Sequence, residues 1–135
     1  MRDFTLVLRD STSMRRIEGV RSFVGEDASG SFGILAGHTR FMTCLSFGLA
    51  RFSDGPESWH YLAVPGAVLY FADNVLNLST RRYFLDDDYE RITTALQQQL
   101  LAEEEELRGM KESLQQLEQE ILKRMWKIGH EEIIP

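Results

Sequence analysis

Residues 61–80, YLAVPGAVLYFADNVLNLST, contain three short apolar runs separated by two turn signals. The turn signals are Pro65-Gly66 and Asp73-Asn74, residue types that readily adopt the backbone conformations of tight turns. Over 75–80, Val, Asn and Ser alternate with Leu, Leu and Thr, which is the period of a half-buried strand. The runs leave no room for crossover helices, so consecutive strands are predicted to pair antiparallel.

The same pattern covers the rest of the first 85 residues. Short runs rich in β-branched, aromatic and aliphatic residues occupy 4–8, 14–18, 20–24, 41–47 and 59–64. Turn-forming residues separate them, as at Asp54-Gly55-Pro56. Several short strands at this spacing favour an antiparallel β-sandwich or barrel over a parallel sheet.

Segment 25–33, GEDASGSFG, is expected to be a loop. It holds three glycines, two acidic residues and two serines, a composition that favours turns over strands.

Residues 86–135 are predicted to be helical. Asp86-Asp87-Asp88 is typical of a helix start, where carboxylates cap free amides and complement the helix dipole. From there to Lys127 the segment has no proline and one glycine, Gly109. Its apolar residues recur at helical spacing, at Leu96, Leu100, Leu107, Met110, Leu114, Leu117, Ile121, Met125 and Ile128. Between Leu107 and Ile121 the steps alternate between three and four, which is the spacing of a heptad seam.

Two arrangements of this helical segment fit the sequence. Gly109 allows a bend into a two-helix hairpin, but a glycine costs only about 1 kcal/mol in a helix interior. One long helix is therefore equally consistent with the pattern. We expect a β-sandwich domain at 1–85 followed by a helical arm at 86–135, with Gly109 as the candidate hinge.

Charge and cysteine content exclude several classes of protein. The first 85 residues hold nine Arg and eight acidic residues, whereas the last 50 hold six basic and thirteen acidic ones. The formal net charge of −6 argues against binding nucleic acid by neutralising phosphates. A single cysteine, Cys44, excludes an intrachain disulfide and a cysteine zinc site. No apolar run has the length of a signal peptide or membrane span, so a soluble protein of a reducing compartment is expected.

The sequence offers no catalytic or cofactor-binding constellation. His38 and His60 have no ligand partner at metal-site spacing, and neither a G-x-S-x-G elbow nor a phosphate-binding loop is found. The four glutamates at 103–106 point around a helix and predict a solvated face. Cys44, in an alternating apolar run, is expected to be a small core residue. A non-enzymatic binding or structural module without metal or cofactor is therefore predicted.

Two stretches resemble a known family. They are 29–52, SGSFGILAGHTRFMTCLSFGLARF, and 61–80, which is followed by the acidic LDDD at 85–88. In order and spacing they resemble the epsilon subunit of F-type ATP synthases, with its G-I-L-P-G-H motif, a G-x-L turn and a later Val-x-Gly-Gly-like turn. The match here is Gly33-Ile34-Leu35-Ala36-Gly37-His38, then Gly48-Leu49, then Val64-Pro65-Gly66-Ala67. The resemblance covers roughly 4–85, and the helical tail in character only.

The sequence also departs from this family. Ala36 stands where the family usually has proline, and the tail lacks the usual Ala-rich helices. Some members bind ATP through an I/L-D-x-x-R-A motif. Asp88 and Arg91 keep its D-x-x-R, so they are a weak ATP candidate, but Asp87 and Ile92 replace the flanking residues. These departures are typical of a divergent branch, with the alternate, sodium-translocating N-type synthases as the candidate.

The resemblance implies a rotor subunit of the central stalk. The family's sandwich binds the gamma subunit and rests on the c-ring. By analogy, the c-ring contact would involve Glu26, Asp27, Ser29, Gly30 and Ser31, and His38 would lie toward gamma. A strand-start histidine bonded to a backbone carbonyl is an equally good reading of His38. The implied location is peripheral, on the cytoplasmic side of a bacterial inner membrane.

The resemblance further implies that the arm inhibits ATP hydrolysis by reaching the alpha/beta catalytic hexamer. Its basic residues are the candidates for pairing with acidic loops there, namely Arg108, Lys111, Lys123, Arg124 and Lys127. The alternative is a stand-alone β-sandwich scaffold with a coiled-coil oligomerisation tail, which the heptad seam favours as readily.

Overall fold

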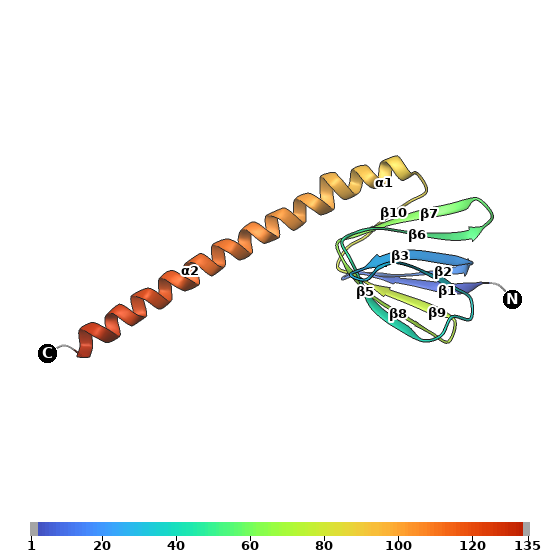
Figure 1. The fold of residues 1–135 in the computed structure, drawn as a ribbon. Coiled ribbons are helices and arrows are strands. Elements are labelled where there is room, and N and C mark those ends of the chain that lie inside the picture. The colour runs from blue at the N-terminus through green and yellow to red at the C-terminus, as the bar shows by residue number, and fades with distance from the viewer. Residues whose placement is uncertain (1–2, 134–135) are drawn as a thin grey trace. The chain divides into compact units, whose positions relative to one another are not determined.

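The computed structural model describes residues 3–133, and Figure 1 shows strands followed by helix along the chain. The strands are β1 Phe4–Arg9, β2 Met14–Val20, β3 Ser22–Asp27, β4 Gly30–Leu35, β5 Phe41–Leu45, β6 Gly48–Gly55, β7 Ser58–Val64, β8 Ala67–Ala72, β9 Val75–Ser79 and β10 Phe84–Asp86. The helical part consists of α1 Tyr89–Ala95, a π-helical turn η1 Leu96–Leu100 and α2 Leu101–Ile133. The predicted change from strands to helix is therefore confirmed.

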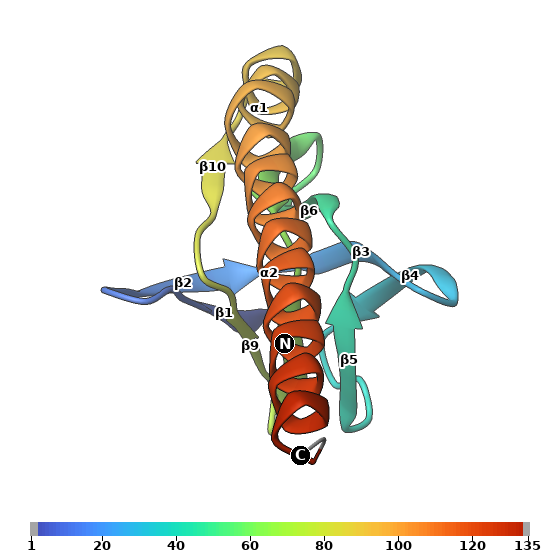
Figure 2. The ribbon, with the colours of Figure 1, turned by 90° about the vertical axis from the view of Figure 1, so that its left-hand side faces the viewer.

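The strands form one curled sheet that packs against itself as a sandwich. Neighbouring strands follow the order β10-β7-β6-β3-β5-β8-β9-β1-β2, and β4 pairs with β3 beside this path. Because the sheet is curled, β2 and β3 run across the direction of β5 in Figure 2. Pairing is antiparallel as predicted, except that β1 and β9 are parallel. Parallel strands need a long connection, and here the chain from β2 to β8 connects β1 to β9.

One face of the curled sheet forms the core. Its largest fully buried side chains include Phe4, Phe23, Phe71, Leu6, Leu8, Ile34, Leu62, Leu69, Leu76 and Leu78. The rings of Phe4 and Phe71 meet edge to face with their centroids 5.6 Å apart. Removing each such side chain from water stabilises the fold by about 1.5–3 kcal/mol. Over 75–80, the buried residues Leu76 and Leu78 belong to one of the two alternating sets.

The expectation of a loop over 25–33 is wrong, because this segment forms most of the β3–β4 hairpin. Gly25 lies inside β3, where an added Cβ would come within 3.0 Å of both Leu45 Cδ2 and Phe23 Cε1. Gly33 lies inside β4, opposite Val24. Of the three glycines, only Gly30 has a positive φ, of 124°. Gly25 therefore provides space for close packing between strands, a role that composition alone does not distinguish from turn formation.

Cys44 is exposed, so the expectation of a core cysteine is also wrong. It lies on β5 between Thr43 and Leu45, and Leu45 is the neighbour that faces the core. Both sets of alternating residues on this strand contain apolar side chains, so the period indicates a strand without showing which face is buried.

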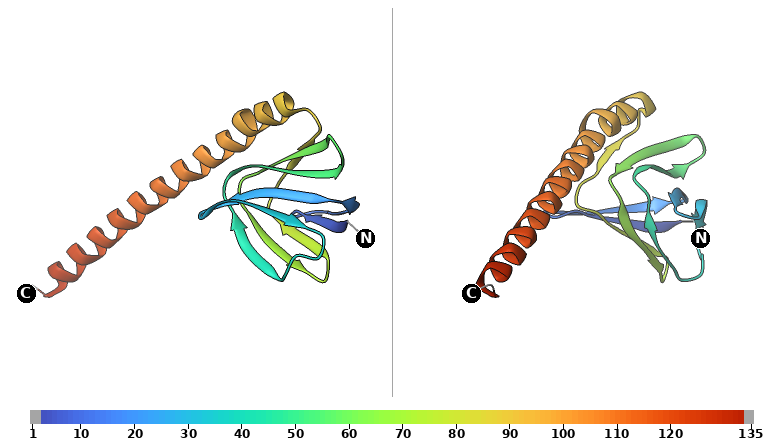
Figure 3. Two further views of the ribbon diagram at one scale, coloured as in Figure 1. Left: turned by 45° about the vertical axis from the view of Figure 1, so that its right-hand side comes forward. Right: turned by 60° about the vertical axis from the view of Figure 1, so that its left-hand side comes forward.

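The helical segment continues without a break from Tyr89 to Ile133, as Figure 3 shows for α2. The structure therefore has one long helix rather than a hairpin, and Gly109 lies within α2. The compact β unit extends to Leu101. Within that unit Ile92 and Leu100 are buried in a second apolar cluster with Ala63. The first three helical turns are thus part of the packed β unit.

Candidate interaction surfaces

The tip of the β3–β4 hairpin brings together the residues predicted to meet a c-ring. Glu26, Ser29 and Ser31 are exposed there, and Asp27 and Gly30 are partly exposed. Asp27 accepts hydrogen bonds from the Ser29 hydroxyl at 2.5 Å, the Ser29 amide at 2.9 Å and the Thr43 hydroxyl at 2.6 Å. These bonds lower the pKa of Asp27, and the bond from the Ser29 hydroxyl has the largest effect. Asp27 thus orders the turn, and Glu26 is the carboxylate that projects into solvent.

An apolar face not identified from the sequence lies on the outer side of β5 and β8. Cys44 is paired with Val68, and Met42 with Tyr70, so these four side chains share one face. Met42 is 66% exposed and Val68 49% exposed. Adjacent exposed apolar side chains of this kind are a candidate interaction surface. We call Met42, Cys44, Val68 and Tyr70 the outer apolar face.

His38 lies in the turn between β4 and β5 and does not extend the outer apolar face. Its amide donates to the Leu35 carbonyl at 3.1 Å, and its Nδ1 lies 2.7 Å from the Thr39 carbonyl oxygen. Its ring meets the edges of Phe41 and Phe71, with centroids 5.7 and 5.9 Å away. His38 is therefore an exposed turn residue at the rim of the core, bonded to backbone as the simpler reading expected.

The start of α1 explains the D-x-x-R fragment in structural terms. Asp88 caps the helix by accepting bonds from the amides of Glu90 at 2.9 Å and Arg91 at 3.4 Å. The Arg91 guanidinium binds both oxygens of Asp86, at 3.0 and 3.1 Å. The Arg91 hydrogen bonds are the first cause of the lowered pKa of Asp86. Asp88 and Arg91, the weak ATP candidates, thus act in capping and pairing here, and ATP binding by them stays a prediction.

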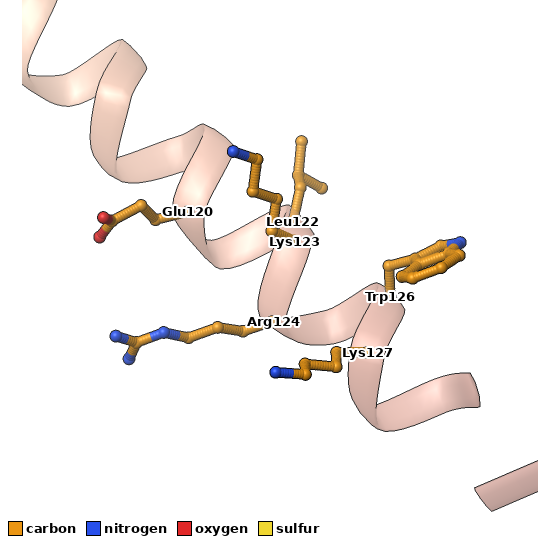
Figure 4. A pocket seen from close by; sticks show the side chains of 6 residues that line it. All are labelled: Glu120, Leu122, Lys123, Arg124, Trp126 and Lys127. Atoms are coloured by element: carbon orange, nitrogen blue, oxygen red, sulfur yellow. The ribbon is translucent and has the colours of Figure 1, made fainter. Parts of the chain in front are cut away.

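The predicted seam of α2 is solvent-exposed. Its heptad residues are each between 45% and 64% exposed, namely Leu107, Met110, Leu114, Leu117 and Ile121. Further along the helix, the Trp126 and Arg124 side chains point to different sides, and Glu120 shares the side of Arg124, as Figure 4 shows. The five cations expected to act in inhibition, Arg108, Lys111, Lys123, Arg124 and Lys127, are exposed along the same helix. The helix therefore presents an apolar stripe and positive charge to solvent.

Over residues 3–129, whose side chains the structure describes, no group of three or more His, Cys, Asp or Glu side chains is arranged to hold a metal ion. In the same part of the chain, no helix has the length and hydropathy needed to cross a membrane.

Comparison with known proteins finds matches in one family. The model of the family described as ATP synthase, Delta/Epsilon chain, beta-sandwich domain matches residues 5–85. The ATP synthase epsilon chain 2 of Cereibacter sphaeroides is 32% identical over 108 residues, which cover 77% of this chain and 74% of that one.

Two solved structures have a similar fold. A chain in the mitochondrial ATP synthase of Euglena gracilis (OSCP/F1/c-ring in rotational state 1) matches with a TM-score of 0.59 and 19% identity, over 72% of this chain. A chain in the central stalk/c-ring structure of the Tetrahymena thermophila mitochondrial ATP synthase matches with a TM-score of 0.51 and 15% identity, over 59% of this chain. The matches span 63% and 64% of those two chains, a little under two thirds. At these identities the likeness concerns the fold.

Proposed function

The chain belongs to the family of ATP synthase delta/epsilon chains, and we propose that it joins the gamma subunit to the c-ring in the rotor of a proton- or sodium-translocating F-type ATP synthase. As an epsilon chain it is a non-catalytic subunit. The observation that carries the proposal is the family match over residues 5–85, which takes in nearly the whole β domain. The working site would be peripheral, on the cytoplasmic side of a bacterial inner membrane.

The outer apolar face is the surface we assign to gamma. A subunit that transmits torque needs a stable contact, and burial of exposed apolar side chains is the main source of stability in such interfaces. The backbones of Met42 and Val68 are already ordered in paired strands, so docking would not require the backbone to be ordered there. His38, bonded to backbone at the rim of the core, would lie beside this contact rather than at its centre.

The hairpin tip is the surface we assign to the c-ring. Glu26 and Ser31 project from a turn that Asp27 holds in place through Ser29 and Thr43. A small, polar and ordered tip can fit successive, nearly identical loops of a ring, and Glu26 can approach basic side chains there.

Cys44 allows a direct test of the gamma assignment. It is the single cysteine of the chain, and it is exposed on the outer apolar face. A photoactivatable crosslinker attached to Cys44 is expected to link the chain to gamma in the reconstituted complex. In the matched control, Cys44→Ser with Ser11→Cys, the label sits on the exposed β1–β2 turn and should give no gamma product. A Cys44 label that never reaches gamma in an intact complex would refute the assignment.

We further propose that α2 inhibits ATP hydrolysis. The exposed apolar seam and the cations of α2 could bind along gamma and the alpha/beta hexamer. A helix that is either bound there or detached from it has two states and can act as a switch. The proposal includes a role for Gly109 as the hinge at which α2 bends when it changes state. Since Ile92 and Leu100 are buried in the β unit, truncation after Leu101 removes α2 from residue 102 onward and leaves that packing intact. Hydrolysis by a reconstituted complex with this truncated chain should rise, whereas unchanged hydrolysis would exclude an inhibitory role.

The alternative, a scaffold with an oligomerisation tail, is supported by the same exposed seam. It predicts a stable homodimer of the isolated chain through Leu107 to Ile121, measurable by analytical ultracentrifugation. A monomer at micromolar concentration would favour the synthase reading.

A further inference from the structure

His60 joins the β6–β7 hairpin to the segment that starts the helix. It lies on β7 opposite Phe52, and the two rings stack at 5.1 Å with an interplanar angle of 31°. Its Nε2 lies 3.1 Å from Asp54 Oδ2 on β6. Its Nδ1 makes a hydrogen bond to Asp87 Oδ1, in the connection between β10 and α1. We call these three residues the His60 bridge.

This geometry requires a particular protonation state. A neutral imidazole has one N–H donor and one acceptor nitrogen, whereas the imidazolium has two donors. Ionised carboxylates only accept, so the neutral ring satisfies one of the two aspartates and turns a lone pair toward the other. Only the charged ring can donate to Asp54 and Asp87 at once. A ring with a carboxylate beside each of its two nitrogens therefore has the surroundings of a charged histidine.

Asp87 lies between the last strand and the residue that caps the helix. It immediately precedes Asp88, the residue that caps α1, and it directly follows β10. We propose that His60 is a proton-dependent link that holds the start of α1 on the β6–β7 hairpin when charged and weakens when neutral, because the neutral ring can donate to only one of the two aspartates. The link lies wholly within the β unit, and it does not depend on whether α2 inhibits hydrolysis.

The surrounding carboxylates favour the charged form of His60. Partial burial of the ring lowers its pKa, but the hydrogen bonds and charges of Asp87 and Asp54 raise it, and the net pKa is above the usual 6.5. Asp54 has a lowered pKa because Ser58 and then His60 bond to it. Arg91 pairs with the other two acids of the connection, Asp86 and Asp88. Asp87 is thus the carboxylate of this segment that pairs with His60.

The direction of the pH effect follows from this raised pKa. The stabilisation is fully present below the pKa of an unfolded histidine, about 6.5. It disappears as the pH rises through the higher pKa of folded His60. A rise in pH above 6.5 is therefore expected to loosen the first turn of α1.

Two measurements on the full chain test the proposal. At pH 6, ¹⁵N NMR should show protons on both His60 ring nitrogens, and the ring should titrate above pH 6.5. Amide protection factors of Glu90, Arg91 and Ile92 should then fall about twofold to fivefold between pH 6 and pH 9, the size expected for an exposed ion pair. A singly protonated ring at pH 6, or protection independent of pH, overturns the proposal.

Variants separate the link from general effects of pH. Asp87→Asn keeps the Phe52–His60 stack but removes one carboxylate, so the His60 pKa should fall and the pH dependence of protection should disappear. His60→Gln should abolish the same dependence. The matched control His38→Gln changes an exposed histidine bonded to backbone and should leave it intact. Retention of the pH dependence in both Asp87→Asn and His60→Gln would refute a role for the bridge.

Discussion

The β unit and α2 use the same apolar residue types with opposite results. Leu69, Leu76 and Leu78 are fully buried in the curled sheet, whereas Leu114 and Met125 on α2 are 64% and 63% exposed. Both regions have the periodicity that their secondary structure requires. The sheet is long enough to curl and cover its own apolar face, but a single helix cannot cover its own stripe. The exposed stripe of α2 is therefore the basis for the proposal that this helix binds another chain.

The largest expected effect contrasts one leucine from each region. Leu76→Ala leaves a cavity in a closed core and should lower the free energy of unfolding by about 3 kcal/mol. Leu114→Ala should change it by less than about 0.5 kcal/mol, because that side chain is already solvated. Urea denaturation of the isolated chain, monitored by circular dichroism, measures both values. A comparable loss for Leu114→Ala would show that the seam is buried in solution, as in the scaffold alternative.

A smaller effect is expected where the sheet packs most tightly. An added methyl group at Gly25 would meet Leu45 and Phe23 at 3.0 Å, so Gly25→Ala should cost about 1–3 kcal/mol. At Gly33, in the paired strand, the nearest atom to an added Cβ is the Phe23 carbonyl oxygen at 3.8 Å. Gly33→Ala is therefore the matched control and should be nearly neutral. Thermal unfolding of both variants tests this difference, and equal losses would mean that backbone freedom rather than packing selects these glycines.

The smallest effect concerns the start of the helix. Asp88→Ala removes the cap from the amides of Glu90 and Arg91 and should cost about 1 kcal/mol. Glu112→Ala, at an exposed position on α2, should stay within about 0.5 kcal/mol. Because Ile92 lies in the β unit, the cap variant should lower the stability of that unit in denaturation experiments. A neutral Asp88→Ala would show that packing of Ile92 and Leu100 positions α1 without its cap.

Much of the architecture could be predicted from particular residues. The turn signals at Pro65-Gly66 and Asp73-Asn74 correctly separated β7, β8 and β9. The three acids at 86–88 correctly marked the helix start, since such local signals act through backbone geometry and short-range hydrogen bonds. The loop expected at 25–33 failed because Gly25 serves a contact with Leu45, a residue distant in sequence. Composition carries no information about such a contact.

The candidate surfaces were predicted less completely. The hairpin tip was identified, but its order depends on a bond between Asp27 and Thr43 on another strand. The outer apolar face was missed because Met42 and Cys44 alternate with Phe41, Thr43 and Leu45, and either set has the composition of a buried face. His60 was noted as an isolated histidine, since Asp54 and Asp87 are brought to it only by the pairing of β6, β7 and β10.

Local sequence patterns were sufficient for the order of strands and helix, the helix start and the family, because these depend on neighbouring residues. The folded chain alone shows which face of β5 is buried and which carboxylates meet His60, and it shows that α2 continues through Gly109 in this structure. Each of these depends on groups that are distant in sequence and become neighbours when the sheet curls and pairs. Side-chain burial and the balance of charges around a histidine are properties of that three-dimensional neighbourhood.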